Sequence, residues 1–207
     1  MGIEARELAD RLRSAVADPQ VLSAIAAVPR ERFVPDSERE RAYENIALPI
    51  SCGQTISQPL VVARMLELLA LDARDRVLDI GTGSGYHAAL LARLAGHVWT
   101  IERHAPLSEQ ARTVLASLGI ENVSFVVGDG YIGLPERAPF DAINVAAAPG
   151  EEIPRALEQQ LADGGRLVVP IGGANQHLIR ITRRGDRLER KRLEPVRFVP
   201  LVREPED

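Results

Sequence analysis

Cysteine is nearly absent from this chain of 207 residues, in which Cys52 is the single example. One thiol excludes an internal disulfide and is typical of a protein from a reducing compartment. The sequence also lacks any run of about 18 apolar residues that could cross a membrane. Its opening residues, MGIEARELADRLRS, have mixed charge and no apolar signal-peptide core. We therefore expect a cytoplasmic protein with no membrane partner.

An excess of positive charge is missing as well. The chain has 25 Lys and Arg against 29 Asp and Glu, which gives a net charge of −4. Proteins that bind nucleic acids usually present a basic face, so no nucleic-acid partner is expected. The one local concentration of arginine, residues 180–192, is interrupted by acids and predicts a solvated hairpin. Without heptads or a surplus apolar face a monomer is expected, and without a Cys/His cluster no metal is expected.

Two regions of the chain differ in pattern. In the first 58 residues, helical spacing of apolar positions predicts helices at 4–16 and 21–28, followed by an irregular stretch to residue 53. From residue 59 onward, short apolar runs alternate with amphipathic segments. The expected strands are 76–80, 97–101, 123–127, 140–146 and 166–171, and the expected helices are 60–71, 86–95, 105–118 and 154–161. Two last strands, 178–183 and 196–202, are expected around a turn at Gly185-Asp186.

Strands that alternate with helices build a parallel sheet that helices cover on both faces. The sequence therefore predicts one doubly wound, Rossmann-like α/β domain over residues 1–207. Its sheet should be mostly parallel, with an antiparallel C-terminal edge because the last strands have no helix between them. Residues 1–58 are expected to form an N-terminal helical addition on the substrate side, and residues 59–207 the ligand-binding core.

A glycine-rich turn follows the first expected strand of that core. It reads Asp79-Ile80-Gly81-Thr82-Gly83-Ser84-Gly85. Glycines there let the backbone turn sharply and approach a ligand, and ligands of such sheets bind beyond the carboxyl ends of the strands. The spacing is GxGxG rather than the GxGxxG of dinucleotide-binding proteins. A tight turn without a ligand is the alternative.

Acidic residues follow the next two strands. Glu102 lies about twenty residues beyond the glycine turn, where a carboxylate can accept both hydroxyls of a ribose. Asp129, between Gly128 and Gly130, can accept the exocyclic amino group of adenine. The alternatives are a surface acid that caps a helix for Glu102 and an ordinary Asp-Gly turn for Asp129. Because no Walker lysine is present, these features together predict an adenosine pocket without phosphate contacts and favour S-adenosylmethionine over ATP.

Segments along most of the chain resemble one family of methyltransferases. They are 45–50 (NIALPI), 53–59 (GQTISQP), 77–86 (VLDIGTGSGY), 128–130, 138–143, 164–172 and 197–202. From about Val28 to Val202 the sequence is similar to the protein-L-isoaspartate O-methyltransferases. GQTISQP is specific to that family, whereas many methyltransferases share the glycine turn. Two departures are Ser51-Cys52 before Gly53, and Asn144 in a strand where an apolar residue is more usual.

The resemblance implies a protein repair reaction with S-adenosylmethionine as cofactor. A methyl group passes to the free α-carboxylate of an isoaspartyl residue in a damaged protein or peptide. The ester then closes to a succinimide, which hydrolyses partly to normal aspartate. The matching family serine makes Ser57 the active-site candidate, with Thr55 in support. The residues expected to line the acceptor cleft are Ile56, Val199, Pro200 and Leu201.

The chemistry implied needs no strong general base, because a carboxylate is already ionised at neutral pH. Accordingly none of the four histidines stands in a motif for a catalytic base. A serine hydroxyl can orient a carboxylate lone pair without neutralising it. The alternative for Ser57 is a cap for the helix that begins near Leu60, and the alternative for 199–201 is an ordinary edge strand.

Three rival functions fit parts of the sequence. One is a methyltransferase of the same fold that acts on a small molecule or RNA, and the 53–59 segment disfavours it. A nicotinamide-dependent oxidoreductase is the second, and the missing GxGxxG spacing disfavours it. The third is a non-catalytic adenosylmethionine-binding protein, which the retention of Ser57, Asp79, Glu102 and Asp129 disfavours.

Overall fold

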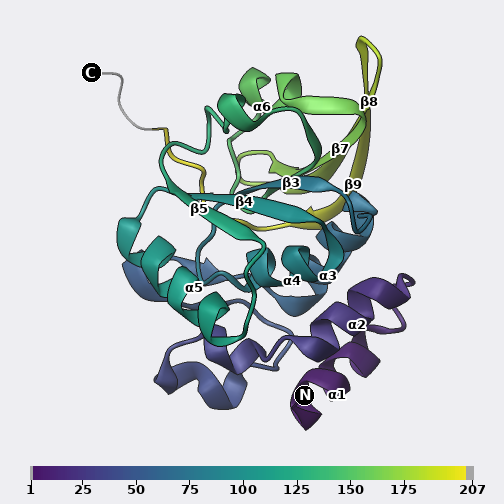
Figure 1. The fold of residues 1–207 in the computed structure, drawn as a ribbon. Helices are drawn as coiled ribbons and strands as arrows, with labels where there is room; N and C mark the ends of the chain where they lie inside the picture. Colours follow the sequence, from purple (N-terminus) through teal and green to yellow (C-terminus); the bar gives the residue numbers. More distant parts are fainter. Residues whose placement is uncertain (1, 204–207) are drawn as a thin grey trace.

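A seven-stranded sheet in the order β5-β4-β3-β6-β7-β8-β9 organises the computed structural model, which describes residues 2–203 (Figure 1). The strands are β3 (Arg76–Ile80), β4 (His97–Glu102), β5 (Val123–Val127), β6 (Phe140–Val145), β7 (Leu161–Ile171), β8 (Gln176–Arg184) and β9 (Arg187–Val196). All pairs from β5 to β7 are parallel, and β8 and β9 are added antiparallel. The predicted sheet, with its antiparallel C-terminal edge, is confirmed.

Helices cover the two faces of this sheet unequally. They are α1 (Ile3–Leu12), α2 (Pro19–Ala27), α3 (Pro59–Leu69), α4 (Tyr86–Leu94), α5 (Ala105–Ser117) and α6 (Arg155–Gln159). Neighbouring strand residues face opposite ways, so Val77 packs with the helices from α1 to α5, whereas Leu78 packs with α6. Within residues 2–203, the second face is covered by the five-residue helix α6 and by Leu134 from the loop before β6.

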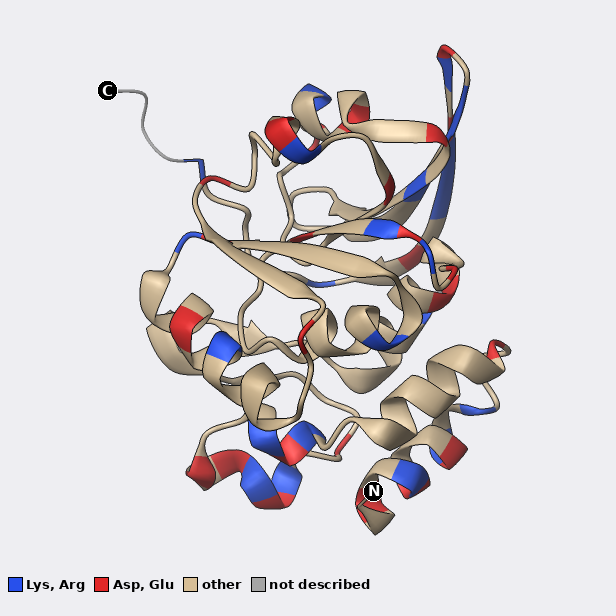
Figure 2. Cartoon of the chain, viewed as in Figure 1, with Lys and Arg blue, Asp and Glu red and all other residues tan. Residues whose placement is uncertain are grey.

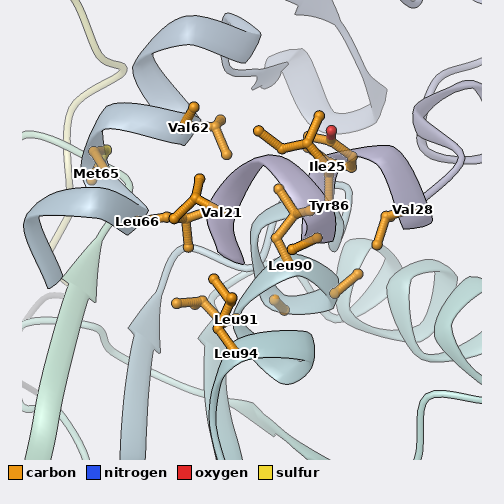
Figure 3. Packing of buried hydrophobic residues seen from close by; sticks show 14 of the residues in the cluster. Val21, Ile25, Val28, Val62, Met65, Leu66, Tyr86, Leu90, Leu91 and Leu94 are labelled. Carbon is orange, nitrogen blue, oxygen red and sulfur yellow. The ribbon is translucent and has the colours of Figure 1, made fainter. Parts of the chain in front are cut away.

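The N-terminal addition is packed onto the core rather than appended to it. Helix α2 begins at Pro19, with Asp18 accepting a hydrogen bond from the Gln20 N–H at 2.8 Å. Its apolar face lies against α3 and α4 (Figure 3). The labelled residues in this contact are Val21, Ile25, Val28, Val62, Met65, Leu66, Tyr86, Leu90, Leu91 and Leu94. Each large apolar side chain buried here stabilises the fold by about 1.5–3 kcal/mol, which fixes the addition in place.

The stretch expected to be irregular, residues 30–53, contains short ordered elements. They are η1 (Arg30–Phe33), η2 (Asp36–Arg41), the two-residue strand β1 (Leu48–Pro49) and η3 (Ser51–Gly53). Strand β1 pairs antiparallel with β2 (Thr55–Ile56), directly before α3. This small ladder holds the segment that carries Thr55 and Ser57.

Two expected elements near the C-terminus are wrong in their bounds. The helix expected at 154–161 ends at Gln159, because Leu161 already pairs with Phe140 as the start of β7. Residues 163–165, which precede the strand expected at 166–171, lie inside β7, at the point where its register with β6 shifts. The last strand is Arg187–Val196 rather than 196–202. Its charged residues show no apolar alternation because β9 is a solvent-exposed edge, so periodicity could not locate it.

The hairpin of β8 and β9 extends away from the body of the molecule (Figure 1). Lys and Arg are concentrated along it, with acidic residues between them (Figure 2). Its turn residues, from Arg184 to Arg187, are exposed, and Gly185 has the positive φ of 57° that the tight turn requires. The predicted solvated hairpin and its turn are confirmed. Across residues 2–203, the helices are too short or too polar to span a bilayer.

The chain changes direction in the sheet between β3 and β6. It runs from β3 outward through β4 and β5, then returns to the other side of β3 as β6. The loops after β3 and β6 therefore leave in opposite directions, and a hydrogen bond of 2.8 Å from the Ala146 N–H to the Ile80 carbonyl holds their bases together. Doubly wound sheets bind ligands in the crevice above such a switch point.

Candidate functional site

The glycine turn after β3 has a backbone geometry that glycine adopts easily and that would strain a residue with a side chain. Gly81 and Gly83 have φ values of 90° and 51°, in the region that residues with a side chain rarely occupy. Both residues line the crevice above the switch point. The backbone can thus pass directly beside a ligand there, as the sequence predicts.

The amide groups of this turn are used inside the protein. Gly81 and Thr82 both donate to the Ile101 carbonyl on β4, at 2.9 and 3.2 Å. Gly83 donates to Glu102 Oε2 at 2.9 Å, and Gly85 to the Thr82 carbonyl at 2.8 Å. A pyrophosphate needs free amides at such a turn. The geometry therefore disfavours a dinucleotide.

Asp79 lies behind the turn rather than in the cleft. It is fully buried and accepts hydrogen bonds from Thr100 Oγ1 at 2.8 Å and from Asn144 Nδ2 at 2.7 Å. Thr100 in turn contacts Thr82 Oγ1 at 2.6 Å, which ties the turn to β4. Burial raises the pKa of Asp79 to about 6, although both hydrogen bonds oppose the rise and the nearby Glu102 charge adds to it. Asp79 braces the turn and lines none of the cavities described below.

Glu102 stands at the end of β4 with a nearly buried carboxylate. Its Oε2 accepts the Gly83 amide, and its Oε1 accepts the His104 amide at 3.0 Å. The second bond partly fits the helix-end alternative, but a residue that is 6% exposed is no surface acid. Each carboxylate oxygen keeps a further lone pair, and Glu102 lines the cleft together with Gly128 and Gly130.

Asp129 is part of a turn, which was the alternative to a ligand-binding role in the sequence. Its Oδ1 accepts the Tyr131 amide at 2.8 Å, and Asp129 does not line the cleft that its two neighbouring glycines line. Gly130 is required there by packing, because a Cβ at that position would lie 2.5 Å from Ile80 Cγ2. Gly85 has a similar packing role against Ala111, at 2.8 Å, and lies outside the cleft.

A second and wider cleft adjoins the first. It has a volume of about 770 Å³ and extends between the segment before α3 and the extended chain after β9. Thr55, Val199 and Pro200 line both clefts, so the two meet at these residues. Leu201 lines the first cleft, and Ser57 the second. A small cavity of about 40 Å³, lined by Thr55, Ile56, Ser57, Thr82 and Ser84 among others, lies against the glycine turn.

Ser57 does not cap helix α3. The helix has Gln58 at its N-cap position without a side-chain bond, and Asn45 Oδ1 instead accepts the Leu60 amide at 3.0 Å. The capping alternative is therefore wrong. The Ser57 hydroxyl makes no hydrogen bond within residues 2–203 and lines both the wide cleft and the small cavity.

The segment 199–201 is a strap rather than a strand of the main sheet. The Ala148 amide donates to the Val199 carbonyl, and the Leu201 amide to the Ala148 carbonyl, both at 2.8 Å. These bonds make a single parallel bridge between Pro200 and Ala148, in the loop after β6. The expected edge strand at 196–202 is thus replaced by one bridge at the switch point.

Arg30 is a residue that sequence reasoning missed. It is fully buried, and it donates through Nε to the Ala42 carbonyl and through Nη2 to the Ser57 carbonyl, both at 2.8 Å. Its guanidinium also lies over the Tyr86 ring, 4.8 Å from the centroid. Burial lowers the pKa of Arg30. Arg30 precedes two further charged residues, Glu31 and Arg32, in a stretch without clear periodicity, and only the fold shows that it holds the backbone of Ser57.

The comparisons with known proteins agree with this geometry. Residues 4–206 match the family model described as protein-L-isoaspartate(D-aspartate) O-methyltransferase. Within residues 2–203, no group of three His, Cys, Asp or Glu side chains is arranged to hold a metal ion.

Solved structures show the same likeness. A protein-L-isoaspartate O-methyltransferase is 34% identical with a TM-score of 0.86, over 94% of this chain and 65% of its own length. The chain therefore spans slightly less than two thirds of that relative. A putative protein-L-isoaspartate O-methyltransferase from Plasmodium falciparum, in complex with S-adenosyl-L-homocysteine, is 26% identical with a TM-score of 0.85, over 97% of this chain and 99% of its own.

A more distant structure shares the fold alone. The precorrin-6y C5,15-methyltransferase of Geobacter metallireducens is 21% identical with a TM-score of 0.50, over 61% of this chain and 68% of its own. The match to the family model extends over nearly the whole chain, N-terminal addition included. The chain belongs to the protein-L-isoaspartate(D-aspartate) O-methyltransferase family.

Proposed function

We propose that this protein transfers a methyl group from S-adenosylmethionine to the α-carboxylate of L-isoaspartyl residues in damaged proteins and peptides. The observation that carries the proposal is the meeting of two clefts at Thr55, Val199 and Pro200. One cleft has the glycine turn and an acid suited to an adenosine, and the other has a free serine hydroxyl. Family membership supports the same activity.

The first cleft would bind the cofactor through groups that its strand ends hold in place. Glu102 would accept the ribose hydroxyls with its remaining lone pairs, while Gly81, Thr82, Gly83 and Ser84 would lie beside the amino-acid end. S-adenosylmethionine supplies an electrophilic methyl group on a sulfonium. Gly128 and Gly130 would border the adenine, with Asp129 fixing their turn.

The second cleft would orient the acceptor. Ser57 would donate its hydroxyl to one oxygen of the isoaspartyl carboxylate, and Thr55 would support it at the junction of the clefts. Alignment and exclusion of water are the main tasks, because the nucleophile is already charged. His87 fits this account, since burial lowers its pKa to about 3 and leaves a poor base.

Many different proteins must fit the wide cleft, so we propose that it reads backbone more than side chains. Val199 and Leu201 use their backbone groups on Ala148, and Pro200 has no N–H to donate. The Pro200 carbonyl would then accept one amide from an extended peptide, and Ile56 would support the floor of the site.

A direct assay tests the proposal. Labelled S-adenosylmethionine is incubated with an isoaspartyl peptide and, separately, with its normal aspartyl twin. We expect methylation of the isoaspartyl peptide alone. Methylation of neither peptide, with S-adenosylhomocysteine still bound, would support the non-catalytic rival, and equal methylation of both would overturn the specificity.

The organisation of the molecule stays part of the proposal. We propose one domain over residues 1–207, of which Met1 and 204–207 lie outside the described residues, with 1–58 as the acceptor-side addition. We further propose a cytoplasmic monomer that needs neither metal nor nucleic acid. Sedimentation at micromolar concentration tests whether the protein is a monomer. Activity in the presence of a chelator tests whether it needs a metal.

A further inference from the structure

Asn144, the departure noted in the sequence, places an amide inside an otherwise apolar strand. It is fully buried on β6 and lies beside Asp79 on β3, with which it is in register. Its Nδ2 donates to Asp79 Oδ1 at 2.7 Å and also lies 3.3 Å from His87 Nδ1 on helix α4. Burying an amide and an imidazole costs stability unless their polar atoms are bonded. The buried Asn144–His87 pair is therefore expected to have a functional role that offsets this cost.

The contacts determine which nitrogen of His87 carries the proton. An ionised Asp79 only accepts hydrogen bonds, so the amide must present its NH₂ group to it. The second hydrogen of that NH₂ can then only meet an accepting Nδ1 on His87. Because burial keeps the ring neutral, the proton must be on Nε2. The contact with Asn144 thus fixes the His87 tautomer in which Nε2 carries the proton and can donate a hydrogen bond.

That donor has no partner within residues 2–203. His87 Nε2 is buried and unbonded, and the whole residue is 7% exposed. His87 lines the small cavity of about 40 Å³ that Ser57, Gly81 and Gly83 also line. The cavity is bounded by the first turn of α4, a nine-residue helix whose N-terminal end favours negative charge. The unbonded His87 Nε2–H, near the N-terminal end of α4, could therefore donate a hydrogen bond to an anionic oxygen of a ligand.

We propose that His87 is a further binding residue, which donates its Nε2–H to a carboxylate at the junction of the two clefts, and that Asn144 is its positioning residue. The inference rests on the proposed function, in which two carboxylates reach this junction. One belongs to the amino-acid end of the cofactor and the other to the isoaspartyl substrate. Ser57 and His87, which both line one cavity, would then both contact the ligands there.

The experiment compares His87→Leu, which removes the donor, with His87→Gln, which keeps an N–H donor on a chain of similar reach. Calorimetry measures S-adenosylhomocysteine, which has the carboxylate, and methylthioadenosine, which lacks the amino-acid end. Initial rates measure KM for an isoaspartyl peptide. His97→Leu is the matched control. His97 is a partly buried histidine at the start of β4, far from the strand ends that form the cleft, and it is hydrogen-bonded to Ser124.

If the cofactor carboxylate is the acceptor, His87→Leu weakens S-adenosylhomocysteine binding by about 10- to 100-fold and leaves methylthioadenosine binding unchanged. If the substrate carboxylate is the acceptor, KM for the peptide rises by a similar factor while both nucleosides bind normally. In either case His87→Gln recovers most of the loss, and Asn144→Leu shows the same selective pattern more weakly. A loss that is equal for both nucleosides, or no loss in a folded His87→Leu protein, would overturn the inference.

The parent protein separates this inference from the proposed function. If the parent binds S-adenosylhomocysteine but does not methylate the peptide, the activity proposal fails and the calorimetric arm still decides the role of His87. If the parent binds no S-adenosylhomocysteine, both proposals fail together. Should His87→Leu not fold, the comparison of His87→Gln with Asn144→Leu provides the same two readings.

Discussion

The proposed cofactor side, with the glycine turn and Glu102, and the proposed acceptor side, with Ser57 and residues 199–201, are held together in different ways. On the cofactor side, the ligand-facing groups follow directly on adjacent parallel strands, and their hydrogen bonds run to the next strand, as between Gly83 and Glu102. On the acceptor side, irregular segments are held by a few bonds between distant residues. Examples are Arg30 to Ser57 and Ala148 to Leu201.

The difference matches what each side would have to do in the proposed reaction. One small molecule of constant shape needs a rigid pocket, and a sheet edge with internally bonded polar groups provides it. A damaged segment from many proteins needs a site that reads a carboxylate and backbone, with little demand on side chains. The acceptor side should therefore respond to mutation mainly in rate, and the cofactor side in binding.

The largest effect should come from Ser57. Ser57→Ala should lose at least about tenfold in methyl transfer, and Ser57→Asp about 100- to 1,000-fold, because it sets a second anion against the substrate carboxylate. Since Ser57 caps no helix, neither change should alter unfolding by more than about 0.5 kcal/mol. Initial rates on an isoaspartyl peptide and urea unfolding test this. An active Ser57→Asp enzyme would remove the assignment.

Asp79 should give the cofactor side a pH-dependent stability. Its pKa of about 6 in the folded protein lies above its ordinary value of 3.8, so the unfolded chain loses the proton first as pH rises. The contribution of Asp79 to stability should therefore fall by about 2 kcal/mol between pH 4 and pH 6, and by about 3 kcal/mol in total between about pH 3 and pH 7, above which it stays constant. Asp79→Asn should lack this component. Parallel slopes for the two proteins in urea unfolding between these pH values would contradict the prediction.

Glu102→Ala should weaken cofactor binding by about 1–3 kcal/mol, because the ribose hydroxyls lose their charged acceptor. The Gly83 amide also loses its partner, so some of the loss reflects the turn. Glu102→Gln, which keeps one acceptor oxygen, should lose less. Calorimetry with S-adenosylhomocysteine measures both. Unchanged affinity in Glu102→Ala would exclude the ribose role.

Arg30→Lys should lower kcat/KM for the peptide by about tenfold while S-adenosylhomocysteine affinity changes by less than about twofold. A lysine keeps the charge but cannot donate to Ala42 and Ser57 in the planar geometry of arginine. Arg166→Lys is the matched control, because Arg166 binds the Leu69 and Ala70 carbonyls and Asp75 on the other end of the sheet. That variant should lose stability without losing rate per folded molecule. Equal rate losses in the two variants would show that Arg30 acts through stability alone.

The smallest effect should be that of pH on the chemical step. The single-turnover rate should change by less than about threefold between pH 6.5 and pH 8, because the nucleophilic carboxylate stays ionised and His87 stays neutral. A rate that falls tenfold per pH unit below pH 7 would reveal a base that the two-sided site does not contain.

Much of the cofactor side could be predicted from the amino-acid sequence. Strands 76–80 and 123–127 occur with the predicted bounds, because each is a short, mainly apolar run that ends at a glycine turn. The glycine turn and Glu102 lie at strand ends and so had to meet at one edge of the sheet. Asp79 and Asp129 do lie next to strand ends, as the pattern predicts. The Asp129 side chain, however, accepts the Tyr131 amide of its own turn, and the Asp79 side chain is buried against Thr100. Sequence spacing cannot distinguish these positions from a position in a cleft.

Local pattern thus predicted most elements of the core and the place of the glycine turn and Glu102 at strand ends, and the quoted motifs indicated the family. Tertiary structure alone decided the acceptor side. Asn45 rather than Ser57 bonds the Leu60 amide, Arg30 holds the Ser57 backbone across 27 positions, and one bridge from Ala148 replaces the strand expected at 196–202. Each of these depends on a contact between distant residues, whose partner periodicity and propensity do not specify. His87 and Asn144 belong to the same class, because a buried polar pair acquires its meaning only from the atoms that surround it.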